Sequence, residues 1–121
     1  MSVRYVLAIY QDEDTRVAPG DPGWAEMMSA FADLNQELDA AGKLLAAEPL
    51  QPTSVATSVR VRDHERLLTD GPFAETTEQF AGFYLVECDD LDEAIGYAAR
   101  IPVARWGTVE VRPVADYSGT V

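Results

Sequence analysis

Two segments of this chain read as strands that are apolar on both sides, and this feature constrains the fold more than any other. They are residues 3–10 and residues 80–86. The alternating sets are Val3, Tyr5, Leu7 and Ile9 against Val6, Ala8 and Tyr10, and Phe80, Gly82, Tyr84 and Val86 against Ala81, Phe83 and Leu85. Strands that are apolar on both faces are usually covered on both faces. The fold must therefore cover both sides of the sheet that holds them.

Two amphipathic helices are expected between the strands. Apolar residues at helical spacing predict a helix over residues 22–41, with Asp21-Pro22 as its N-cap and first helical residue and Gly42 as its stop signal. A second helix follows Asp90, which with Glu93 resembles a capping box, and Pro102 ends it. Further extended segments are expected at residues 44–47, 54–62, 66–69 and 108–114.

This order of elements predicts a single α+β domain spanning residues 1–121. Two β-α-β halves in a chain of 121 residues favour a ferredoxin-like βαββαβ sheet with both helices on one face. The helices then cover one side of the sheet only. Because large bare apolar patches are rare on monomers, a second copy of the chain is the economical cover for the other side. We therefore expect a homodimer.

Composition excludes several classes of function. The net charge is −12, from 21 acidic and 9 basic residues, and no basic patch suits nucleic acid or an anionic membrane surface. No apolar run approaches the ~20 residues of a membrane span. Cys88, the single cysteine, is expected to be a buried inert thiol, and His64 is the single histidine. We expect no metal site, no organic cofactor and a cytoplasmic protein whose N-terminus enters a strand directly.

Five segments carry a resemblance to a known family. They are Val3–Tyr10, Leu50–Pro52, Thr69–Gln79, Leu91–Ala94 and Val109–Pro113. Together they resemble the YCII-related, DGPF-domain family over about residues 3 to 114, and the run Asp-Gly-Pro-Phe-Ala-Glu-Thr is the specific part. The resemblance implies a dimeric α+β barrel, in which two ferredoxin-like sheets pack face to face. Members are often encoded beside extracytoplasmic-function sigma factors, and relatives in the wider superfamily act on small ring lactones or haloaromatic breakdown products without a cofactor.

The chain departs from the family pattern at Thr77, at Phe80-Ala81-Gly82, which replaces a smaller, glycine-paired start to the strand, and at His64, in a hairpin turn where glycine is more usual. Thr77 stands where a lysine is common, which puts any role of that lysine in doubt here. Some relatives are thought to use a His/Asp pair, but His64 lies in the turn Asp63-His64-Glu65 and matches no such position. We interpret His64 as an exposed titrating side chain, because no third group that would orient a base is evident.

Asp70 and Glu75 are the candidate catalytic residues. They lie five positions apart on a loop that glycine and proline constrain, beside an expected apolar wall of Phe73, Phe83 and Tyr84. Two carboxylates in such surroundings are able to have separated pKa values and to divide acid and base roles. The structural alternative is that Asp70 caps the turn by bonding to its own backbone.

Arg60 and Arg112 are the candidate ligand-binding cations. Both lie on polar faces of predicted strands, and in a barrel those faces look into the space between subunits. Arginines there suit a carboxylate ligand, while the alternative is a structural ion pair with Glu110. Phe73 and Tyr84 are the expected apolar contacts of the same ligand.

Two functions from different classes follow. The first is a cofactor-independent enzyme, of isomerase, lyase or dehalogenating type, acting on a small anionic or ring-shaped molecule. The second is a non-catalytic protein that binds a small molecule or regulates a partner, linked to a sigma factor. An enclosed pocket where Asp70 or Glu75 meets an arginine favours the enzyme.

Overall fold

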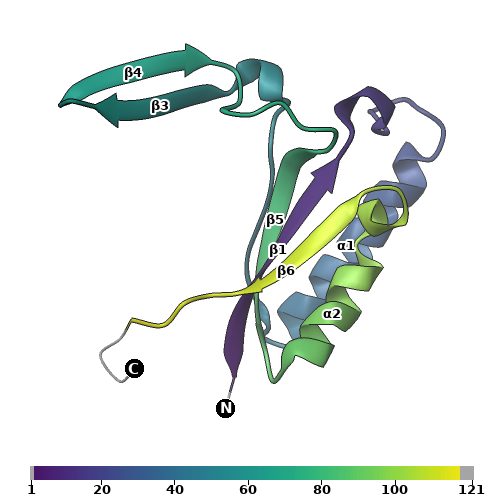
Figure 1. Cartoon of the computed structure of the whole chain (residues 1–121). Helices are drawn as coiled ribbons and strands as arrows, with labels where there is room; N and C mark the ends of the chain where they lie inside the picture. The colour runs from purple at the N-terminus through teal and green to yellow at the C-terminus, as the bar shows by residue number, and fades with distance from the viewer. Residues whose placement is uncertain (1, 118–121) are drawn as a thin grey trace.

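A computed structural model describes residues 2–117 as a sheet with helices on one face (Figure 1). Its main elements are β1 (Val3–Gln11), α1 (Trp24–Ala40), β2 (Leu44–Pro49), β5 (Gln79–Cys88), α2 (Leu91–Arg100) and β6 (Thr108–Pro113). The four strands pair in the order β2-β5-β1-β6, and every neighbouring pair is antiparallel. This α+β arrangement is consistent with the predicted ferredoxin-like fold. No helix in the described part of the chain is long and apolar enough to cross a bilayer.

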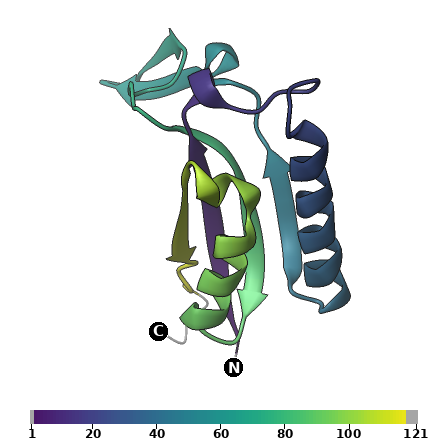
Figure 2. The ribbon, with the colours of Figure 1, turned by 90° about the vertical axis from the view of Figure 1, so that its right-hand side faces the viewer.

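The remaining two strands form a separate hairpin that projects from the body. β3 (Thr57–Arg62) and β4 (Glu65–Asp70) pair only with each other. We call residues 57–70 the arm. Figures 1 and 2 show that the arm leaves the body on the side of the sheet away from the helices. Its turn, Asp63-His64, has φ angles of 50° and 65°, which is the backbone of a two-residue type I′ hairpin.

The hydrophobic core lies between the helices and one face of the sheet. Leu7 of β1 pairs with Tyr84 of β5, and both are buried there. Leu34 and Leu38 of α1 and Ala94 and Ala98 of α2 are the buried residues of the covering helices. Such a layer of helices on sheet stabilises the domain mainly by removing apolar surface from water.

The other face of the sheet has no cover within the chain, and we call it the open face. Cross-strand pairs place Val6 with Leu85, Ala8 with Phe83, and Tyr10 with Phe80 on this face. The rings of Tyr10 and Phe80 lie 5.5 Å apart. The prediction that Phe80 would point the same way as Gly82 and Tyr84 is wrong. A β-bulge at Ala81 inserts one residue, so the alternation reverses at that point.

The start of α1 also differs from the prediction. The helix begins at Trp24 with Gly23 as its N-cap (φ 88°), because the Asp21 carboxylate instead accepts a hydrogen bond of 2.8 Å from the Ala18 N–H in the preceding turn. The predicted stop is confirmed. Gly42, with φ 72°, ends the helix in a left-handed conformation that glycine adopts without strain.

The predicted N-cap at Asp90 is confirmed, and the Glu93 side chain completes a variant of the capping box one residue earlier, at Asp89. The Asp90 carboxylate accepts a hydrogen bond of 2.9 Å from the Glu93 N–H. The Glu93 carboxylate reaches back to the Asp89 N–H at 3.0 Å and also accepts from Lys43 Nζ at 2.8 Å. Cys88, at the end of β5, is a fully buried free thiol as expected, and burial raises its pKa to about 11.

Candidate functional site

A cavity of about 400 Å³ lies between the N-terminal half of α1 and the helix-covered face of the sheet. Its helix wall consists of Trp24, Met27, Met28 and Phe31, and Ala47, Ala81 and Gly82 are among the sheet residues below. Bulky side chains on one side thus face small ones on the other. Because Ala47, Ala81 and Gly82 add little volume, the sheet does not fill the space beneath α1.

Among the polar residues of this largely apolar lining, two are hydrogen-bonded to each other between α1 and the sheet. The Tyr84 hydroxyl of β5 donates a hydrogen bond to the Asn35 side-chain oxygen of α1. Tyr84 is buried, and desolvation raises its pKa to about 12, although the bond to Asn35 acts in the opposite direction. The phenol therefore stays neutral near pH 7, so it serves as a hydrogen-bonding group rather than a base. In the described part of the chain the Asn35 amide NH₂ makes no hydrogen bond, which leaves it available to a ligand.

The mouth of the cavity is held by Glu13, in a short 3₁₀ turn after β1. Its carboxylate accepts hydrogen bonds from the Thr53 N–H at 2.8 Å and the Thr53 hydroxyl at 2.9 Å. The Glu13 N–H donates to the Gln79 side-chain oxygen at 2.9 Å. These bonds fix the segments before α1 and after β2 around the opening. Among the described residues that line the cavity, Arg16 is the one cation.

The residues predicted as catalytic lie outside this lining. Asp70 is the last residue of β4, and Glu75 follows in the loop to β5, with both side chains exposed. Phe73, in the same loop, is 78% exposed. The expected apolar wall is divided, because Phe73 lies outside the lining, whereas Phe83 and Tyr84, which alternate along β5, are both among the residues that line the cavity. Of the six candidate site residues, Tyr84 lines the cavity.

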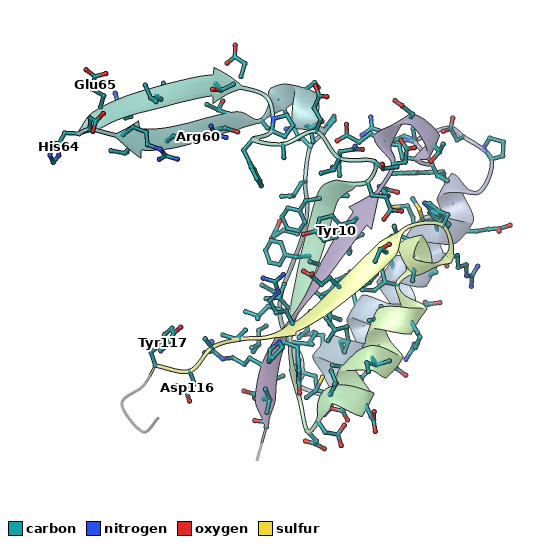
Figure 3. All side chains as sticks on the ribbon, in the orientation of Figure 1. Tyr10, Arg60, His64, Glu65, Asp116 and Tyr117 are labelled. Carbon is teal, nitrogen blue, oxygen red and sulfur yellow. The ribbon has the colours of Figure 1, made fainter. Side chains whose placement is uncertain are left out.

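The two candidate arginines lie in different sheets. Arg60 is in the arm, whereas Arg112 is in β6 and forms an ion pair of 3.0 Å with Glu110. Figure 3 shows Arg60 midway along the arm and His64 at its tip. Arg112 thus pairs with Glu110, as the structural alternative expected, although this ion pair is exposed and not internal. A single chain does not bring Arg60 and Arg112 to one ligand, and their binding roles stay predictions.

The cavity was not predicted from the sequence, although one residue of α1 indicates it. Asn35 lies four residues after Phe31 and three before Leu38, so it is a polar residue within the apolar stripe of α1. A polar side chain in that position needs a buried partner or a ligand. Asn35 is therefore the residue from which the site was detectable.

Comparison with known proteins places the chain in a family. The model of the YCII-related domain matches residues 3–118. The chain belongs to the YCII-related domain family. It is also 37% identical over 115 residues to an uncharacterised protein of Rhizobium meliloti (strain 1021), an alignment that covers 93% of each chain. The resemblance on which the sequence analysis relied is thereby confirmed at the level of the family.

Proposed function

We propose that this YCII-related protein binds a small, largely apolar molecule in the cavity beneath α1. The observation that carries the proposal is the Tyr84–Asn35 pair, a hydrogen-bonding unit between α1 and β5 in a largely apolar wall. Ligand pockets typically have volumes of about 300 to 1,000 Å³ and combine apolar lining with a few polar groups. The cavity of about 400 Å³ matches both criteria and suits a molecule of one or two rings.

The polar groups of the cavity narrow the class of ligand. Tyr84 and Asn35 suit a carbonyl, hydroxyl or lactone oxygen, since Asn35 offers N–H donors and the phenol accepts through its oxygen. Arg16 at the mouth suits a carboxylate at the other end of the molecule. The proposed ligand is therefore a ring compound with an oxygen function, neutral or singly anionic. A regulatory role beside a sigma factor is compatible with binding such a molecule.

Catalysis is a second candidate function, and one contact favours it. The hydrogen bond from Glu13 to Gln79 ties the end of the loop that carries Asp70 and Glu75 to the cavity mouth. In this proposal the loop supplies the proton-transferring carboxylates, and the chemistry is of isomerase, lyase or dehalogenating type without a cofactor. Arg60 and Arg112 hold the anionic part of the substrate if a second copy brings them together.

The proposed assembly is a homodimer joined through the open face. Val6, Phe83 and Leu85 form an apolar centre on that face, and Phe80 is 42% exposed beside them. Sheets that pack face to face bury such residues about 10 Å apart. We also propose a cytoplasmic location, where a single free cysteine stays reduced.

Ligand binding is testable by tryptophan fluorescence. Trp24 lines the cavity and Trp106 is the second of the two tryptophans, so Trp106→Phe leaves one reporter in the wall. We expect benzoate or δ-valerolactone to change this emission saturably and to raise the melting temperature. Ala47→Phe, which fills the cavity, should abolish both effects, whereas Ala46→Phe, on the opposite face of β2, should preserve them. Equal binding to both variants would contradict the proposed site.

Asp70→Asn separates binding from catalysis. If Asp70 acts only as a proton-transferring group, thermal stabilisation by the probe survives the substitution and any turnover of the probe is lost. If stabilisation is lost as well, Asp70 faces the ligand. If turnover is unchanged, the catalytic role of Asp70 is refuted while the binding proposal stands.

A further inference from the structure

The arm exposes more apolar surface than its own fold requires. Val59, Val61 and Leu68 are 58%, 61% and 62% exposed. Val59 pairs with Leu68 across the hairpin, and Val61 follows on the same face. An isolated two-stranded hairpin is at best marginally stable in water, and contiguous exposed apolar residues commonly mark an interface. The arm therefore needs a surface to cover it.

The charge of the arm differs from that of the body. Residues 57–70 contain three arginines and three acidic residues, so the arm is neutral and the rest of the chain carries the whole net charge of −12. None of the charged side chains of the arm makes an ion pair within the described residues. Because the arm is neutral and apolar, it can contact the acidic body of a second copy without the charge repulsion that two acidic bodies would have.

The direction of the arm indicates which surface could cover its apolar residues. Figure 1 shows the arm projecting beyond the open face, on the side away from α1 and α2. Strands of six residues extend about 20 Å, enough to reach a molecule seated there. The open face has an apolar centre, and charged residues of both signs surround it, namely Glu48, Glu87, Glu110, Arg4 and Arg112. An apolar surface that the arm can cover is thus present on this same chain.

We propose that the arm docks on a second copy of this chain, so that the two protomers of a symmetric dimer clasp each other. The proposal rests on the proposed homodimer but goes beyond it, because it assigns a second, separate contact to β3 and β4. In a two-fold dimer each arm makes the same contact, and the apolar face of Val59, Val61 and Leu68 is buried twice. The clasp also places Arg60 of each copy on its partner.

The test compares two matched sets of apolar-to-serine substitutions. The arm variant is Val59→Ser with Val61→Ser and Leu68→Ser. The control is Leu91→Ser with Ile95→Ser on α2, where both side chains are 48% exposed but far from the arm in sequence. Sedimentation between about 1 and 100 µM should show a dimer dissociation constant raised at least tenfold in the arm variant and unchanged in the control.

Hydrogen exchange supplies an independent readout. In the wild type, amides of residues 57–70 should gain protection at the higher concentration and lose it on dilution. Arg60→Glu with Arg66→Glu should weaken the dimer without removing apolar surface, which keeps the test decisive if the serine variant aggregates. Far-UV circular dichroism verifies that the body of each variant is folded.

Two results would overturn the clasp. Arm amides that exchange at one rate at all concentrations, with an arm variant that dimerises like the wild type, refute it and leave the open-face homodimer standing. A wild-type chain that remains monomeric at about 100 µM refutes both the clasp and the homodimer. Neither result affects ligand binding in the cavity, which the fluorescence experiment tests separately.

Discussion

At the scale of single residues, Tyr84 connects stability with binding. Its hydroxyl is buried among apolar groups and gives its hydrogen bond to Asn35. A buried polar group costs free energy unless it is paired, so Tyr84 and Asn35 are stable in this wall only as partners. A ligand that hydrogen-bonds to the pair gains specificity, because an analogue without the matching oxygen leaves polar groups unsatisfied.

Tyr84→Phe should therefore destabilise the fold although it creates almost no cavity. Loss of the hydroxyl leaves the Asn35 oxygen without its donor, and we expect the free energy of unfolding to fall by about 1 to 2 kcal/mol. Chemical denaturation with urea measures the change. Tyr97→Phe is the matched control, since Tyr97 packs beside the core and its hydroxyl makes no hydrogen bond within the described residues. Equal losses for the two variants would show that the Tyr84–Asn35 bond contributes nothing.

At the scale of elements, Glu93 joins the start of α2 to the start of β2. Its hydrogen bond with Lys43 lowers the pKa of Glu93 and raises the pKa of Lys43. A carboxyl whose pKa is lower in the folded state stabilises it above the unfolded pKa, and this contribution disappears as the pH falls through the folded pKa. The contribution of Lys43 to stability is fully present below pH 10.5, the ordinary pKa of lysine, and it disappears as the pH rises through the higher folded pKa.

Glu93→Gln should lower the melting temperature at about pH 7, and its difference from the wild type should shrink as the pH falls through the lowered folded pKa of Glu93. The shrinkage follows because the wild-type carboxyl then takes up a proton and loses the same interaction. Asp92→Asn is the control. Asp92 lies in the same first turn of α2 and is exposed, so its substitution should change the melting temperature less. A difference that is constant over this pH range would contradict the assignment.

The turn of the arm carries backbone strain that glycine relieves. His64 has φ 65°, and a non-glycine residue in this region costs on the order of 1 kcal/mol. In dilute, monomeric protein His64→Gly should thus slow hydrogen exchange in β3 and β4 while leaving the global melting temperature unchanged, because within one chain the arm pairs only with itself. Glu65→Gly, one residue later in β4, should have the opposite effect, since glycine weakens a strand. Slower exchange in both variants would exclude turn strain as the cause.

Local sequence patterns predicted most elements because local physics determines them. The period of apolar residues in β1 and α1, the N-cap at Asp90 and the stop at Gly42 depend on neighbours within one or two turns. The predictions were wrong where the same residues are compatible with two local structures. Asp21 was equally suited to cap a helix or a loop, and it caps the loop. The bulge at Ala81 lies beside Gly82, and glycine inside a strand is compatible with either a regular strand or a bulge; the bulge reversed the direction of Phe80.

At the scale of the whole molecule, Asn35 indicates a polar site on α1, but the walls around it were not predictable from the sequence, since they come from segments distant in the chain. Trp24 and Ala47 meet across the cavity only after α1 is placed on the sheet. The loop of Asp70 and Glu75 has a distinctive composition, but its sequence does not show that the side chains lie outside the cavity. Family membership was carried by that loop, whereas the cavity is defined by small residues that no motif marks.

The open face is the proposed dimer interface, and a charge placed at its centre tests this proposal. Leu85 lies near the centre of the open face, between Val6 and Ala46 on the neighbouring strands. Leu85→Asp introduces a charge there that the dimer would have to bury, and a buried unpaired carboxylate is strongly unfavourable. We expect a folded monomer at concentrations where the wild type is a dimer, with an unchanged far-UV spectrum because the side chain faces away from the core. Ile95→Asp, on the exposed side of α2, should remain dimeric. If Leu85→Asp sediments like the wild-type dimer, the open face is not the interface, and the two sheets do not pack face to face.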